Sequence, residues 1–81
     1  MSHIRDLKLG QLEQLRHKIT TLEAQAAGAI LIISMKTYSK NDLAGLEVEL
    51  ISQAAKDLKE YVLQLRILKK QANDLNEELY G

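Results

Sequence analysis

Apolar residues recur at alternating three- and four-residue intervals along most of this chain, and one short polar segment interrupts the pattern. This spacing places a single apolar stripe along an α-helix, as in coiled coils. The interruption covers residues 37–42, Thr-Tyr-Ser-Lys-Asn-Asp, whose Ser, Asn and Asp are typical of helix caps. We therefore expect an all-α fold in which two long helices pack antiparallel as a hairpin.

The predicted hairpin forms one domain over residues 1–81. The first helix is expected over about residues 4–37, the turn over about 38–41 and the second helix over about 40–79. The chain contains no proline and only four glycines, while Leu, Ala, Gln, Glu and Lys are common. These residues favour long helices, so composition agrees with the periodicity.

The apolar stripes predict a coiled-coil seam between the two helices. Its residues are Leu12, Leu15, Ile19, Leu22, Ala26, Ala29, Ile51, Ala54, Leu58, Tyr61, Leu65 and Leu68. The numbers of facing residues add up to 80, which places the fold-back at residue 40. Opposite charges then fall at matching heights: Arg5 with Asp74, Glu13 with Arg66, and Glu23 with Lys56.

Charged residues usually occupy the positions beside such a seam. In the parts of both helices next to the predicted connection, several of these positions are apolar instead. Helices that are apolar nearly all round are buried. We expect this surface to be covered by a second copy, giving a homodimeric four-helix bundle, or by another helical protein. The predicted contacts are Ile30, Ile32, Ile33, Val48, Leu50 and Val62. Gly28 and Gly45 indicate either close helix packing or a local irregularity.

No residue pattern predicts catalysis, a cofactor or a metal site. Cysteine is absent, and His3 and His17 lack the spacing that places two ligands on one helix face. The chain has no Glu-x-x-His motif, glycine-rich phosphate loop or serine nucleophile motif. We therefore predict a non-enzyme that binds no small-molecule substrate.

Charge and hydropathy argue against nucleic acid and membrane partners. Lys and Arg together number 11, as do Asp and Glu. The basic cluster of Arg66, Lys69 and Lys70 is interpreted as a solvated face, with weak nucleic-acid binding as an alternative. The longest uncharged run, residues 24–35, is shorter than the roughly 20 residues that cross a bilayer. No signal-peptide pattern is present, so a cytoplasmic location is expected.

In length and hairpin plan the chain resembles the needle subunits of type III secretion systems and their small helical chaperones. It departs from the needle subunits in the turn, where their typical proline is absent. The resemblance implies a subunit or small chaperone of a larger assembly. That is the alternative to our main hypothesis, a non-catalytic, homodimeric interaction module with a structural, adaptor or regulatory role.

Overall fold

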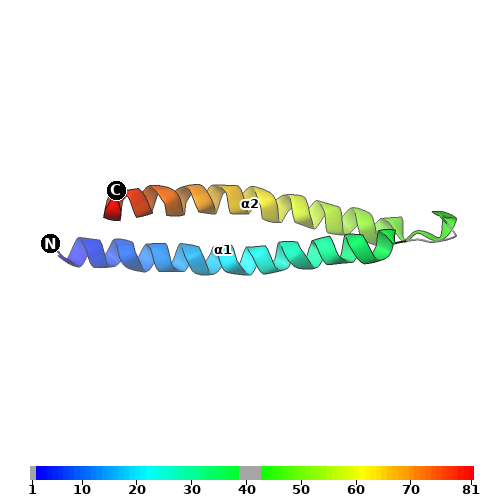
Figure 1. Cartoon of the computed structure of the whole chain (residues 1–81), viewed down its shortest axis with the longest axis horizontal. Coiled ribbons are helices and arrows are strands. Elements are labelled where there is room, and N and C mark those ends of the chain that lie inside the picture. The colour runs from blue at the N-terminus through cyan, green and yellow to red at the C-terminus, as the bar shows by residue number, and fades with distance from the viewer. Residues whose placement is uncertain (1, 39–42) are drawn as a thin grey trace.

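The protein is a helical hairpin, described by a computed structural model over residues 2–38 and 43–81. Helix α1 spans Ser2–Thr37, the short 3₁₀ helix η1 spans Leu43–Gly45, and α2 spans Val48–Tyr80. The two long helices lie side by side and antiparallel, with both termini at one end and the connection at the other (Figure 1). The hairpin measures 65 × 17 × 14 Å.

Helix α1 runs without a break for 36 residues. Threonine hydroxyls bond back to carbonyls one turn earlier, as between Thr20 and Arg16 at 3.0 Å. A basic residue, Lys36, lies in the last turn, where it interacts favourably with the helix dipole. The Tyr38 amide donates to the Ser34 carbonyl at 3.1 Å and closes the helix.

The second helix begins at Val48, not near residue 40 as the sequence predicted. Leu43–Gly45 forms η1 instead, and the Leu46 amide donates to the Leu43 carbonyl at 3.2 Å. Glycine is costly inside a helix, and Gly45 ends this tight turn. Gly45 therefore marks a local irregularity. The predicted turn at 38–41 and the candidate caps at 39–42 lie outside the described residues, apart from Tyr38.

The core is a thin line of side chains between the helices. Leu12 is 2% exposed, and Ala26, Ala29 and Ala54 are also buried. The other residues of the predicted seam are partly buried: Leu15, Ile19, Leu22, Ile51, Leu58, Tyr61, Leu65 and Leu68. Leu79, beyond the predicted seam list, is buried as well. Among the residues that the structure describes, α1 and α2 are the two long helices, and no further element covers this line.

The predicted register is wrong by about one helical turn, as Arg5 shows. We expected Arg5 level with Asp74. Its Nη1 instead donates to the Leu79 carbonyl at 3.1 Å, and its guanidinium lies 5.3 Å from the centre of the Tyr80 ring. Asp74 pairs with Lys70 on its own helix, at 3.5 Å.

A second predicted ion pair is also replaced. Glu23 was expected level with Lys56, but its carboxylate lies 3.1 Å from the ammonium of Lys69. At the other end of the hairpin, Lys36 lies 3.0 Å from Glu47. In each of these contacts the two residue numbers add up to more than 80, so all of them indicate that α2 is shifted in the same direction from the predicted register.

The cause of the displacement is the length of the connection. With α1 ending at Thr37 and α2 beginning at Val48, the fold-back is centred between residues 42 and 43 rather than at 40. Seam residues recur every three or four positions, so a shift of about one turn returns them to the interface. The same residues thus form the seam with different partners.

Candidate interaction surface

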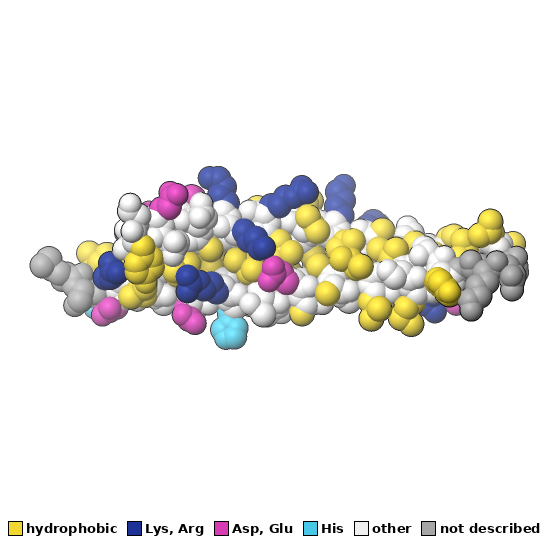
Figure 2. All heavy atoms as spheres, in the orientation of Figure 1, with side chains coloured by type: hydrophobic (Ala, Val, Ile, Leu, Met, Phe, Trp, Pro, Cys, Tyr) yellow, Lys and Arg dark blue, Asp and Glu magenta, His cyan; other side chains and the backbone are white. Residues whose placement is uncertain are grey.

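Large apolar side chains are exposed mainly at the loop end of the hairpin. We call this group the apolar collar. Its members are Ile30, Leu31, Ile32, Met35, Tyr38, Leu43, Val48 and Leu50, all at least 44% exposed. In Figure 2 hydrophobic side chains reach the surface on both helices toward the loop, while Lys and Arg lie along the middle of the hairpin and its terminal part.

The structure places most of the predicted partner contacts in this collar. Ile30 and Ile32 are exposed on α1, and Val48 and Leu50 are exposed on α2. Ile33 and Val62 are partly buried. The predicted set lacked Leu31, Met35, Tyr38 and Leu43. Leu31 and Met35 lie further round α1 than the positions that flank the seam, Tyr38 directly follows α1, and Leu43 lies in η1.

The two helices leave two exposed faces, one on each side of the line of buried side chains. The first, here called the Ile30 face, carries the ion pair between Glu23 and Lys69. Ile30 follows Glu23 by seven residues and Val62 precedes Lys69 by seven, which is two helical turns in each case. Ile30 and Val62 therefore lie on this face, each two turns nearer the loop than its ion-pair residue, and Val48 lies four turns beyond Val62.

The opposite face, here called the Ile32 face, contains an open hollow between the helices. The hollow has a volume of about 280 Å³ and is lined by Gln25, Gly28, Ala29, Ile32, Ala54, Asp57 and Tyr61. Leu50 precedes Asp57 by seven residues, so it lies two turns nearer the loop on the same face. Gln53 donates from Nε2 to the Asp57 carboxylate at 2.9 Å.

Gly28 borders this hollow without serving the packing of α1 on α2. A Cβ atom at Gly28 would meet no heavy atom within 4 Å, and the same holds at Gly10 nearer the N-terminus. The close-packing interpretation of Gly28 therefore fails within the hairpin. The missing side chain leaves space that the chain does not fill by itself.

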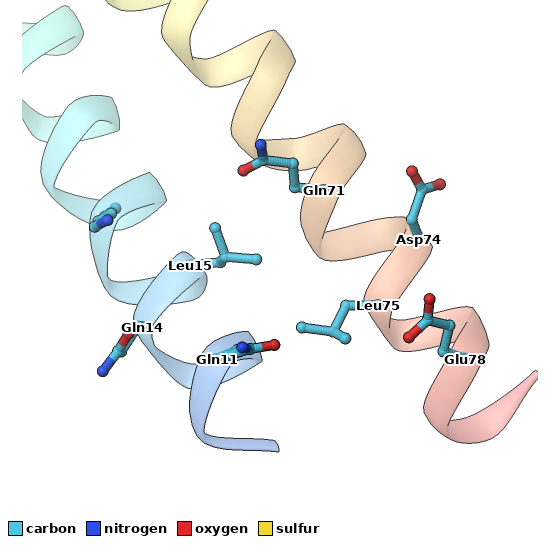
Figure 3. A pocket seen from close by; sticks show the side chains of 8 residues that line it. Gln11, Gln14, Leu15, Gln71, Asp74, Leu75 and Glu78 are labelled. Atoms are coloured by element: carbon cyan, nitrogen blue, oxygen red, sulfur yellow. The ribbon is translucent and has the colours of Figure 1, made fainter. Parts of the chain in front are cut away.

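A second, larger groove lies nearer the termini, with a volume of about 410 Å³. Figure 3 shows Leu15 and Leu75 directed into the space between the helices, with Glu78 beside Leu75 and Asp74 at the outer side of α2. Both carboxylates have cationic partners, Lys70 at 3.5 Å and Lys8 at 3.0 Å. The groove is open to solvent, so it does not provide the water-excluded environment of a typical catalytic pocket.

The titratable side chains of the described residues lie at or near the surface. Among them, no group of three His, Cys, Asp or Glu side chains is placed to hold a metal ion. No polar or charged side chain in the described part of the chain is buried. His3 and His17 are both exposed.

The predicted basic cluster is partly neutralised. Lys69 pairs with Glu23, and Lys70 pairs with Asp74. Arg66 is exposed beside them. A phosphate-binding surface draws its affinity from cations that can exchange counterions for phosphate, and two of these three already have carboxylate partners.

Neither of the two long helices that the structure describes is apolar enough over a sufficient length to cross a lipid bilayer. Comparison with protein families, curated proteins and solved structures gave no match to this chain.

Proposed function

We propose that this chain is a non-catalytic interaction module that binds a helical surface, and that its working form is a homodimer. The observation that carries the proposal is the apolar collar. Eight large side chains, each roughly half exposed or more, surround one end of a narrow hairpin. Stable monomers rarely expose contiguous apolar patches beyond about 300–600 Å².

The thin core supports the same proposal. Burial is confined to one line of side chains, and several of these are alanines. Two helices in contact along one stripe gain little from apolar burial relative to the entropy lost on ordering the chain. A second hairpin covering one face would convert the stripe into the centre of a four-helix bundle.

The non-catalytic part of the proposal rests on the nature of the grooves. Both are open, and the carboxylates of the larger groove are held in surface ion pairs. Enzymes generally place their reactive groups in a concave, partly dehydrated site. The hairpin is better suited to present a surface than to enclose a substrate.

Denaturation at several protein concentrations tests the proposal. The urea midpoint, followed by circular dichroism, should rise with protein concentration, because dimerisation stabilises the folded state by mass action. Replacing both Ile30 and Ile32 with Lys should abolish that rise. The matched control replaces two exposed polar residues of the same helix, Gln14 and Thr21, with Lys. A midpoint independent of concentration in the unmodified chain would contradict the homodimer.

A second candidate is a subunit or small chaperone of a larger assembly. It is favoured by the presence of exposed apolar residues on both faces, Ile30 and Val48 on one and Ile32 and Leu50 on the other. A twofold dimer covers one face of each hairpin. A further helical protein could then occupy the other face, and titration of the dimer with candidate helical partners would reveal a complex larger than the dimer.

A further inference from the structure

We infer that the second copy docks on the Ile32 face in an antiparallel orientation, so that Ile32 of each copy enters the hollow beside Gly28 of the other. This inference rests on the proposed homodimer and specifies its face, its overlap and its direction. The dimer would overlap through the loop halves of the two hairpins. The terminal halves would project in opposite directions.

The hollow is the receiving part of this contact. It has a volume of about 280 Å³, and small residues, Gly28, Ala29 and Ala54, form much of its lining. A Cβ at Gly28 would meet nothing within 4 Å. Gln25, Asp57 and Tyr61 complete the lining, so the recess is partly polar. Protein interiors are packed to crystal-like density, so a recess of this size suits side chains from a partner.

Ile32 is the inserting part. It is 44% exposed at the edge of the hollow, four residues and about one helical turn after Gly28. In the antiparallel dimer the twofold axis lies in the plane of the interface, perpendicular to the helix axes, at the level of residue 30. It exchanges the levels of residues 28 and 32, so each Ile32 is placed over Gly28 of the other copy. Side chain and recess then fit in both directions, as an isologous contact requires.

A parallel dimer does not achieve this fit. Its twofold axis would run along the hairpins and keep every residue at its own level. Hollow would then face hollow, and the two recesses would join into a larger void whose lining lacks contacts. The antiparallel arrangement also leaves the charged terminal halves in solvent, because the copies overlap at the loop ends.

The available area is sufficient for a specific contact. The hairpin is 65 Å long and 17 Å wide, so the loop half of one face covers roughly 500 Å². The two copies together would bury about 1,000 Å², near the lower limit for a specific interface. Lys36 and Glu47 at this end pair with each other at 3.0 Å, which limits repulsion between identical surfaces.

The Ile30 face is less suited to the second copy. The ion pair between Glu23 and Lys69 crosses it, with side chains about half exposed, so docking there would remove two charged groups from water. The hollow on the Ile32 face contains one charged residue, Asp57, which accepts a hydrogen bond from Gln53. Val62 on this face is already partly buried. The two faces therefore differ in a way that single substitutions can test.

Two matched pairs of variants test the face, with the dimer dissociation constant measured by sedimentation. Gly28→Gln fills the hollow, whereas Gly10→Gln makes the same change at the other open position of α1. Ile32→Lys alters the inserting side chain, whereas Ile30→Lys places the same charge on the opposite face. We expect at least a tenfold weaker dimer for Gly28→Gln and Ile32→Lys and less than a threefold change for the controls. Equal effects within each pair, or larger effects in the controls, would overturn the assignment.

A distance measurement tests the orientation. The chain has no cysteine, so His17→Cys supplies a single, exposed site for a spin label. With the axis at residue 30, the labels would be separated by about 26 residues along the helix direction, or about 40 Å. A parallel dimer would bring them within about 30 Å, since its helices are about 10 Å apart. The shorter distance would overturn the antiparallel arrangement.

These outcomes separate the inference from the proposal on which it rests. A chain that stays monomeric at every concentration contradicts the homodimer itself. A stable dimer that is indifferent to Gly28→Gln and Ile32→Lys leaves the homodimer standing and overturns the docking face alone.

Discussion

The ammonium of Lys36, in the last turn of α1, lies 3.0 Å from the carboxylate of Glu47, the residue before α2. The pair joins the two helices across their connection and marks the level at which the chain reverses. Both side chains are substantially exposed, at 38% and 52%. Such a pair contributes less than about 1 kcal/mol, so the apolar seam must supply most of the energy that fixes the register.

The register can be tested by cross-linking. Ala29 and Ala54 line the same hollow, whereas the sequence alone paired Ala26 with Ala54. We expect the double variant Ala29→Cys/Ala54→Cys to form an intramolecular disulfide under mild oxidation. Ala26→Cys/Ala54→Cys should form it less readily, because disulfides require a narrow range of Cβ separations. Mass spectrometry without reductant measures both, and faster closure of the second pair would contradict the register.

Leu12 provides a test of the core. It is 2% exposed, so Leu12→Ala removes buried methyl groups and should lower the free energy of unfolding by about 2–4 kcal/mol. Leu7 is 58% exposed on the same helix, and Leu7→Ala should cost less than about 1 kcal/mol. Urea denaturation of the two variants at one protein concentration compares them. Equal losses would show that the line of buried side chains is misplaced.

Gly10 offers a stabilising substitution. A Cβ there meets no atom within 4 Å, and glycine inside a helix costs about 1 kcal/mol relative to alanine. Gly10→Ala should therefore raise the free energy of unfolding by roughly 0.5–1 kcal/mol and raise the melting temperature. Thermal unfolding followed by circular dichroism measures the change. A lower melting temperature would mean that this position is packed against something.

Arg5 tests the terminal end of the hairpin. Its guanidinium donates to the Leu79 carbonyl and lies over the Tyr80 ring. Arg5→Ala removes both contacts and should destabilise the chain by about 1 kcal/mol. Arg16→Ala, at an exposed position of the same helix, is the control and should change stability by less than about 0.5 kcal/mol. Identical melting of the two variants would contradict these contacts.

The apolar pattern was enough to predict two helices and to place residues such as Leu12 and Ala54 near their contact. The spacing carries this information because only one side of each helix can face the other. The start of α2 was not predictable in the same way. Gly45 indicated a possible irregularity, but a single glycine does not reveal whether a helix passes through it or begins after it.

The register of the two helices could not be predicted from the apolar pattern either. A seam with three- and four-residue spacing accepts α2 in positions one turn apart, so the pattern alone could not select between them. The pairing of Arg5 with Leu79, and of Glu23 with Lys69, became evident only from the structure. The hollow beside Gly28 was also hidden, since glycine in a sequence does not reveal whether its missing side chain leaves a recess or a close contact.

The most direct test of the central claim is the solution mass of the unmodified chain, measured by light scattering over about a hundredfold range of concentration. One chain has a mass of 9.1 kDa. The homodimer predicts twice that mass, approached as concentration rises and retained at the upper end of the range. A mass that stays at that of one chain throughout would show that the apolar collar is not covered by a second copy.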